Sequence, residues 1–516
     1  MTHDPPTPPT VRVSGGETAR TRAVLSAARE AATDATVLST GPTGLAALTP
    51  LVALTDEAWT AYLADPTPEA TADAVASLES GDRPADAHAV VPHEDPPTVL
   101  PAPDEGPLSV GRRRVLARCG WTDPTAPTTE ASADADPDET LARASDLGLL
   151  GRGRGDASTD RPVATDWETA HETDGESVVV VNAAEADPHA DADRTLLAGV
   201  PGEVLDGALA VAGAVGAEEC VVAVNEAHET ATRRVEDAVA ALDVDGRVQV
   251  VSTPDEYTVG EPTMTLESLE GADRIEARRS PPGPATYGLH GQPTVVHTPR
   301  TLAQVREALL RPESFDADDA DPGTRLVTVA GDVAAPATVE LPTSGSLDTA
   351  LDAVDPTGRP RAYCVGGRFG GLTRSLDVLP SAPALAGARF GTNGVVELLD
   401  DTRCVVAFAG RRSRFAQETN CGRCGPCREG SKQLTELLRD VYDGDYQTDM
   451  LRELTRVMRR TSLCGFGRDA SRPVTTGMDE FDGEFRAHAE GRCPSGACGS
   501  GANHDREATI RRGEEA

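Results

Sequence analysis

The sequence contains almost no lysine. Lys432 is the only lysine among 48 basic residues, whereas Asp and Glu together number 84, and the 516-residue chain has a net charge of −36. The acidic residues are spread along the whole chain, whereas an acidic binding face would gather them in one place. Such a surface favours solubility at high salt, because carboxylates hold water and ions while salt screens their repulsion. The composition therefore predicts a halophilic protein, and the lack of a basic stripe argues against a nucleic-acid partner.

Long apolar runs are also absent. No run of 18 or more apolar residues occurs, and the opening segment MTHDPPTPP lacks the basic and apolar parts of a signal peptide. These features predict a cytoplasmic protein without direct membrane insertion, or one that is peripheral to a membrane complex anchored by other subunits.

Cysteine is sparse but unevenly distributed. Ten cysteines in a chain of this length do not make a disulfide scaffold, yet six of them lie between residues 421 and 498. In a cytoplasmic protein, such a concentration indicates metal binding or redox chemistry. The chain length itself predicts roughly three or four domains.

The pattern of hydrophobic residues predicts the secondary structure of each region of the chain. From about residue 141 to 310, short apolar strands such as SVVVVNAAE and ECVVAVNE alternate with helices, which indicates an α/β layer with parallel strands. RLVTVAGDVAAPATVELP then predicts a hairpin, and two amphipathic helices follow near the C-terminus. The polar segment after Gly499 is predicted to be disordered.

The densest chemistry lies in the segment CGRCGPCREG, residues 421–430. Cys421, Cys424 and Cys427 are spaced so that the loop turns three thiolates toward one concavity. A fourth ligand is needed, and Cys464 is well placed, because an antiparallel helix pair brings its two ends together. Zinc is the alternative metal, but zinc sites usually use two separated CxxC pairs, whereas CxxCxxC with a remote cysteine is typical of a 4Fe-4S cluster.

This segment, in QETNCGRCGPCREG, resembles the HESCGxCxPCREG signature of the flavin- and NADH-binding F subunit of complex I and of the related β subunits of NAD-linked hydrogenases and formate dehydrogenases. SLCGFGRDASRPV followed by FDGEFRAH resembles the family's TxCxLGxxxxxPV…FRxEFExH, and RCPSGAC resembles the RCPxGxC that ends the hydrogenase-type members. The resemblance covers nearly the whole chain. It implies a multidomain α/β protein whose 4Fe-4S cluster passes electrons to other redox subunits, namely 2Fe-2S or ferredoxin-type carriers.

The resemblance also implies a domain order. The units are a thioredoxin-like domain (1–83), a linker (84–106), an FMN/NADH-type α/β domain (107–310), an SLBB-like β-grasp domain (324–390), a helical 4Fe-4S domain (391–490) and a tail (491–516). In the first domain, GPTGLAALTPLVAL resembles the 2Fe-2S module of hydrogenase-type members, but Pro42 and Ala46 stand at its cysteine positions. We therefore expect no cluster there.

Part of the family's FMN and NADH site is retained. The matching residues are Gly151, Arg152, Gly153, Asn182, Glu185, Tyr257 and Glu261. No catalytic residue can be assigned, because His290, His297 and Tyr287 are better explained as satisfied polar side chains.

Other positions depart from that site. Arg154 replaces the middle glycine of the cofactor loop and would block close approach of a cofactor to the backbone. Ala157 and Gly283 stand where the family has aromatic rings, which removes stacking surfaces. His297-Thr298 replaces an asparagine pair that reaches the flavin phosphate. These changes argue against tight FMN or NAD(H) binding, although Arg152 and Arg154 could instead hold a different anion.

Three hypotheses about function follow. The preferred one is an iron–sulfur electron-transfer subunit whose flavin site has decayed. The alternatives are an active FMN-dependent NADH:acceptor oxidoreductase and a zinc-stabilised interaction or scaffold protein. The tail adds one open question, because Cys493 and Cys498, with His488 and His504, could hold zinc, whereas free thiols are the simpler interpretation.

Overall fold

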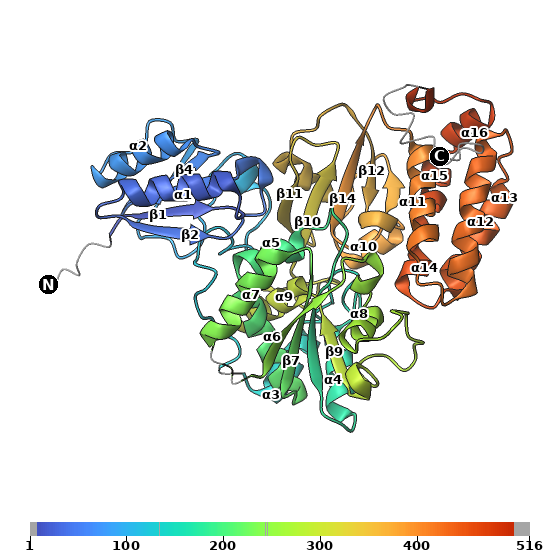
Figure 1. Ribbon diagram of the computed structural model, residues 1–516, viewed down its shortest axis with the longest axis horizontal. Helices are drawn as coiled ribbons and strands as arrows, with labels where there is room; N and C mark the ends of the chain where they lie inside the picture. The colour runs from blue at the N-terminus through green and yellow to red at the C-terminus, as the bar shows by residue number, and fades with distance from the viewer. Residues whose placement is uncertain (1–7, 134, 243, 245, 500–516) are drawn as a thin grey trace.

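The computed structural model describes residues 8–499 except 134, 243 and 245. Its chain forms three sheet-containing units and one helical unit (Figure 1). The N-terminal unit lies at one end, the helical unit lies at the other, and two sheets with their helices lie between them. The predicted disordered segment after Gly499 lies outside the described residues.

The N-terminal unit is a five-stranded mixed sheet of order β2-β1-β3-β4-β5. β1 pairs in parallel with β2 and antiparallel with β3. Its strands are β1 (Thr10–Ser14), β2 (Thr36–Thr40), β3 (Leu51–Thr55), β4 (Trp59–Ala64) and β5 (Ala89–Pro92), and its helices are α1 (Ala19–Ala31) and α2 (Pro68–Glu79). β5 lies inside the range 84–106 expected to be a linker, because the Pro- and Asp-rich composition there conceals a short AVVP edge strand.

The second unit contains the predicted parallel sheet, of order β8-β7-β6-β9. All three strand pairings are parallel, which confirms the expectation from the buried apolar runs. Its strands are β6 (Val178–Ala183), β7 (Glu219–Asn225), β8 (Val248–Thr253) and β9 (Thr294–His297). Its helices are α3 (Pro137–Asp146), α4 (Val163–Glu172), α5 (Ala192–Gly199), α6 (Pro201–Val215), α7 (Glu229–Leu242), α8 (Pro262–Leu269) and α9 (Pro299–Leu310).

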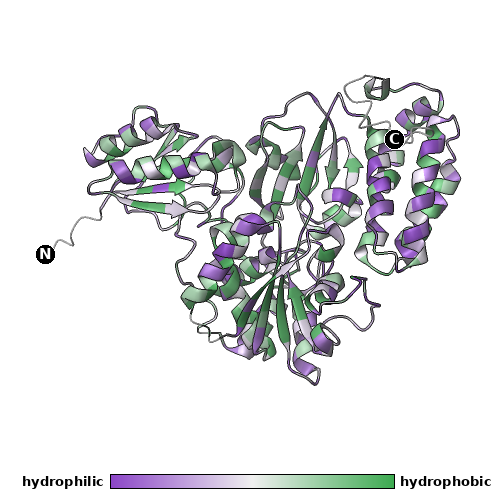
Figure 2. Cartoon of the chain, in the orientation of Figure 1, coloured by the Kyte–Doolittle hydropathy of each residue, from purple (hydrophilic) through white to green (hydrophobic). Residues whose placement is uncertain are grey.

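Hydrophobic burial places the polar residues of this unit at one edge of the sheet. The strands are predominantly hydrophobic (Figure 2), and their valines are buried under the surrounding helices. Asn182 and His297 lie at the carboxyl ends of β6 and β9, two strands that pair with each other. Ligands of parallel sheets bind at such an edge, outside the carboxyl ends of the strands.

The third unit is a five-stranded sheet of order β11-β10-β14-β12-β13. The predicted hairpin is confirmed as β10 and β11, which pair antiparallel. The elements are β10 (Thr324–Gly331), β11 (Ala337–Pro342), β12 (Pro360–Val365), β13 (Gly371–Thr373), β14 (Val395–Asp400) and α10 (Ala382–Gly387). β14 lies beyond residue 390, the expected end of this domain, yet it pairs between β10 and β12.

The fourth unit is the helical bundle. Its helices are α11 (Val405–Thr419), α12 (Gly425–Tyr442), α13 (Thr448–Thr461), α14 (Gly465–Asp469), α15 (Arg472–Glu480) and α16 (Asp482–Ala489). Leu434, Leu438 and Val441 of α12 are fully buried, as expected for the apolar stripe of an amphipathic helix. Among the described residues no single helix has the length and apolar composition to cross a membrane, although the bent pair α5–α6 passes that test jointly.

Candidate functional site

The four cysteines of the predicted cluster motif come together around one small void. Cys421, Cys424 and Cys427 follow α11, and Cys464 follows α13. Cys424 is the N-cap of α12 and Cys464 is the N-cap of α14. The helix pair α12 and α13 thus brings Cys464 back to the three cysteines at the start of α12, as the sequence predicted.

The pattern of these four cysteines favours a 4Fe-4S cluster over a single ion. Three thiols from one CxxCxxC loop and a fourth from a remote segment are typical of such a cluster, whereas zinc sites usually use two separated CxxC pairs. Met264, Ala277, Leu463 and Phe466 also line the void, so most of the surrounding side chains are apolar.

The electrostatics of the buried thiols also favours a positively charged group in this void. Burial, and then the neighbouring Cys424 thiol, raises the pKa of Cys427. Burial, and then Glu261, raises the pKa of Cys464 to about 12. Thiolates crowded in this way form readily only when metal ions compensate their charge.

A second group of ligands lies at the opposite end of the bundle. Cys404, His488, Cys493 and Cys498 offer one ligand atom each, and all four atoms lie within 4.8 Å of one another. The Sγ of Cys404 lies 3.2 Å from Nε2 of His488, and the Sγ of Cys498 lies 3.6 Å from the same nitrogen. Three sulfurs and one imidazole nitrogen at this spacing match a closed structural zinc site.

The orientation of His488 supports that assignment. Its Nδ1 lies 2.7 Å from the carbonyl oxygen of Glu484, one turn earlier in α16, which favours a proton on Nδ1. Nε2 is then left with its lone pair directed at the sulfurs, as in ligating histidines whose other nitrogen donates to a carbonyl. Hydrogen bonding from Cys404 lowers the pKa of Cys493 to about 3.

Sequence reasoning found three of these four residues and missed Cys404. It proposed His504 in its place, and His504 lies outside the described residues. Cys404 is the N-cap of α11 and stands 84 positions before His488. In the sequence, Cys404 is marked only by the lack of another cysteine close to it in the chain.

An ion pair lies in the expected flavin region, at the edge of a large cavity. Arg154 donates to the carboxylate of Glu185 at 2.7 Å and to the carbonyl oxygen of Tyr257 at 2.6 Å. Its guanidinium lies 3.7 Å from the centre of the Tyr257 ring. Burial disfavours this charge, but Glu185 outweighs burial and raises the pKa of Arg154. The arginine that replaces the loop glycine therefore binds two residues that the family pattern retains.

The first glycines of the loop are packed against protein rather than open to a ligand. Arg152 is buried and forms a 2.7 Å ion pair with Asp321. Gly153 has a φ of +74°, and a Cβ there would lie 3.1 Å from the guanidinium carbon of Arg300. Gly151 is packed more tightly still, because a Cβ there would lie 2.5 Å from a carboxylate oxygen of Asp156. Arg152 and Arg154 both have carboxylate partners, which argues against the expectation that they hold a separate anion.

His297 is likewise satisfied within the protein. Trp167 Nε1 donates to His297 Nε2 at 2.6 Å, and His297 Nδ1 lies 2.9 Å from a carboxylate oxygen of Asp156. Both His297 and Asp156 are buried. Both ring nitrogens of His297 thus have partners within the protein, which agrees with the expectation of a satisfied histidine.

The two remaining predicted residues have structural partners too. Asn182 donates to the carbonyl oxygens of Gly155 at 2.8 Å and Gly260 at 3.3 Å. Glu261 caps α8, where it accepts from the backbone N–H groups of Thr263 and Met264. Burial raises the pKa of Glu261.

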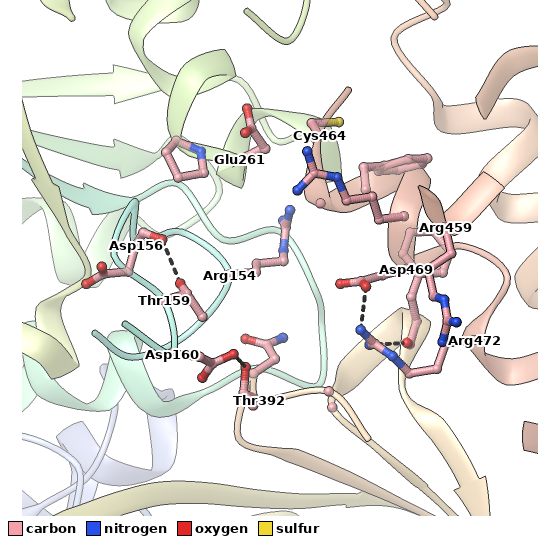
Figure 3. A pocket seen from close by; sticks show the side chains of 18 of the residues that line it. Arg154, Asp156, Thr159, Asp160, Glu261, Thr392, Arg459, Cys464, Asp469 and Arg472 are labelled. Carbon is pink, nitrogen blue, oxygen red and sulfur yellow. Dashed lines mark hydrogen bonds and ion pairs between the residues drawn. The ribbon is translucent and has the colours of Figure 1, made fainter. Parts of the chain in front are cut away.

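A cavity of about 1210 Å³ separates this loop from the helical bundle. Figure 3 shows Arg154, Asp156, Thr159 and Asp160 on one side and Arg459, Asp469 and Arg472 on the other. Cys464 and Phe466 border both this cavity and the void of the four cysteines. A single layer of side chains therefore separates the cavity from the predicted cluster.

Two sequence profiles match the chain in these regions. The Nuo51 FMN-binding domain matches residues 145–307, and the NADH-ubiquinone oxidoreductase-F iron–sulfur binding region matches residues 407–488. An F subunit of the NADH-quinone oxidoreductase of Rhizobium meliloti (strain 1021) is 30% identical over 398 residues, which cover 71% of this chain and 92% of the relative. The chain belongs to the family of NADH-quinone oxidoreductase F subunits. The family assignment made from the cysteine motif is thus confirmed.

Other relatives are hydrogenase subunits. NADP-reducing hydrogenase subunit HndC of Solidesulfovibrio fructosivorans is 29% identical over 380 residues, which cover 67% of this chain and 76% of that protein. A crystal structure of an NAD⁺-reducing [NiFe]-hydrogenase in the H₂-reduced state has a TM-score of 0.65 at 25% identity, covering 99% of this chain and 90% of that one. The chain is accordingly a redox subunit with a 4Fe-4S region and an FMN-binding type of domain.

Proposed function

We propose that this chain is an iron–sulfur electron-transfer subunit that holds one 4Fe-4S cluster on Cys421, Cys424, Cys427 and Cys464 and has lost its flavin site. The cluster supplies one-electron redox chemistry at the edge of the cavity. The chain contributes the thiolates, the start of α12 and the buried aromatic surface of Phe466. Its partners are other redox subunits that carry 2Fe-2S or ferredoxin-type centres.

The observation that carries the proposal is the Arg154–Glu185 pair. FMN needs backbone that it can approach closely and groups that are free to contact it. The side chain of Arg154 blocks this close approach to the backbone. It also already binds the Glu185 carboxylate and the Tyr257 carbonyl oxygen. The residues present do not fit the flavin, so no step through flavin is assigned.

Reduction of the cluster by different donors tests this function. Dithionite should bleach the visible absorption of the anaerobically purified protein, because it reduces the cluster directly. NADH should leave the absorption unchanged, because hydride oxidation requires a flavin to split the electron pair. Rapid bleaching by NADH would refute the proposal.

That result would instead support the second candidate function, an FMN-dependent NADH:acceptor oxidoreductase. The match of residues 145–307 to an FMN-binding domain favours it. The domain division and a cytoplasmic or membrane-peripheral location also remain predictions.

We further propose that Cys404, His488, Cys493 and Cys498 bind a structural zinc ion. Parent protein should contain about one zinc per chain. Cys493→Ser should lose this zinc and keep its iron, since the two sites lie at opposite ends of α12. Metal analysis by mass spectrometry checks both elements in one sample, and an unchanged zinc content in Cys493→Ser would eliminate the site.

The acidic composition leads to a prediction about salt. With a net charge of −36, the folded chain repels itself at low ionic strength, and screening relieves this repulsion. The melting temperature should therefore rise as KCl increases from about 0.1 M to molar concentrations. Thermal unfolding followed by circular dichroism measures it, and a flat or falling melting temperature would contradict the halophilic interpretation.

A further inference from the structure

Four aromatic rings pack together beside the predicted cluster. They belong to Tyr257, Phe369, Phe415 and Phe466, and the centres of neighbouring rings lie 4.9 to 5.9 Å apart. Aromatic residues make up 3% of the chain, so four rings in contact are a marked local concentration. The same apolar core contains Cys427, one of the four cysteines of the cluster motif.

The rings come from three different units of the fold. Tyr257 precedes α8 in the parallel-sheet unit, Phe369 lies between β12 and β13, and Phe415 and Phe466 lie in α11 and α14 of the bundle. The rings of Phe369 and Phe466 are nearly perpendicular, and Tyr257 contacts both of them edge to face. This arrangement is favoured for aromatic pairs, and it holds the ring of Phe466 in place.

Phe466 lies between the large cavity and the void of the four cysteines. Leu463, Cys464 and Phe466 line both spaces. Leu463 and Cys464 are half-buried, whereas Phe466 is buried, with 6% of its surface exposed. Its helix α14 also packs closely on the cysteines, because a Cβ at Gly467 would lie 2.8 Å from the Cβ of Cys427. The ring of Phe466 is therefore the largest apolar group in the layer that separates the two spaces.

Water on the cavity side of this layer would affect a cluster on the other side. The cavity is lined by charged side chains such as Asp469 and Arg459, and Arg459 is exposed to solvent. A 4Fe-4S cluster held by four thiolates carries more negative charge when reduced than when oxidised. Surroundings from which water is excluded disfavour the more highly charged state, so they lower the reduction potential.

We propose that Phe466, held in place by Tyr257 and Phe369, excludes cavity water from the Cys464 side of the cluster and so lowers the reduction potential of the cluster. Phe466 is a positioning residue in this role, because it acts on the solvation of Cys464 and is not itself a ligand. The family pattern TxCxLG has leucine at this position, so the ring is a feature of this chain. The inference rests on the proposed function only in requiring the cluster.

Redox titration of anaerobically purified Phe466→Ala, followed by electron paramagnetic resonance of the reduced cluster, tests this role. The variant should be reduced more easily than the parent, because water that hydrogen-bonds to the sulfurs favours the reduced state. We expect an about tenfold higher ratio of reduced to oxidised cluster at one fixed potential, which is a shift of about 59 mV for one electron. In D₂O, electron spin-echo modulation should show more deuterium near the cluster of the variant than near that of the parent.

Phe485→Ala is the matched control. Phe485 is a fully buried aromatic residue of α16 in the same bundle, and it borders neither the cavity nor the void. Its variant should keep the potential of the parent. Phe466→Leu keeps an apolar side chain and should raise the potential by a smaller amount, and it carries the test if Phe466→Ala does not retain iron.

The iron content of each sample separates two kinds of failure. A parent protein without iron would contradict the proposed function. An unchanged potential in iron-loaded Phe466 variants, a raised potential without added deuterium, or an equal shift in Phe485→Ala would overturn the role of Phe466 and leave the cluster assignment intact.

Discussion

Cys424→Ser is expected to remove the 4Fe-4S cluster from the protein. Anaerobically purified parent should contain about four irons per chain, and the variant should contain close to none, because a cubane needs all four of its thiolates. Cys424 is also the N-cap of α12, and Cys427 lies in the first turn of that helix. The variant should therefore melt at a lower temperature, with the loss confined to the helical bundle.

The control for this experiment is Cys220→Ala. Cys220 lies in β7, where it is buried in the core of the parallel-sheet unit and borders neither metal site. It should keep the full iron content. Cys493→Ser gives the reciprocal comparison, since it should keep iron and lose zinc. Full iron in Cys424→Ser, or stoichiometric zinc without sulfide in the parent, would contradict the cluster assignment.

The second large effect is expected at Arg154. Parent protein should bind added FMN no more tightly than about 10 μM, because stacking rings are lost and each 1.4 kcal/mol costs tenfold in affinity. Arg154→Gly should remove the side chain that binds Glu185 and covers Tyr257, and should tighten FMN binding by about tenfold or more. Quenching of flavin fluorescence on titration measures both constants.

Arg154→Gln separates bulk from charge in this experiment. It keeps most of the side-chain volume and removes the positive charge. If volume blocks the site, Arg154→Gln should bind FMN as weakly as the parent does, while Arg154→Gly binds it more tightly. Both variants leave Glu185 buried without its cation, so both should lower the melting temperature. Tight FMN binding by the parent would show that Arg154 does not block the flavin.

The cluster ligands could be predicted from the sequence because their positions depend on residues that lie close together in the chain. Cys421, Cys424 and Cys427 share one loop, and Cys464 follows an amphipathic helix whose length fixes where the chain returns. The parallel sheet was predictable for a similar reason, since uninterrupted valine runs indicate strands that are buried on both faces.

The remaining features depend on contacts between residues far apart in the sequence. Cys404 reaches His488 only because α11 and α16 pack in the same bundle. The Arg154–Glu185 pair could not be read from the motif, which marks Glu185 simply as a retained residue.

The most direct measurement is the content of iron, acid-labile sulfide and flavin in protein purified without air. We predict about four irons and four sulfides per chain, with less than about one tenth of a flavin. Those values would establish a cluster-bearing subunit without its own flavin. Stoichiometric FMN in the same preparation, together with rapid reduction by NADH, would contradict the account and identify the chain as an active dehydrogenase subunit.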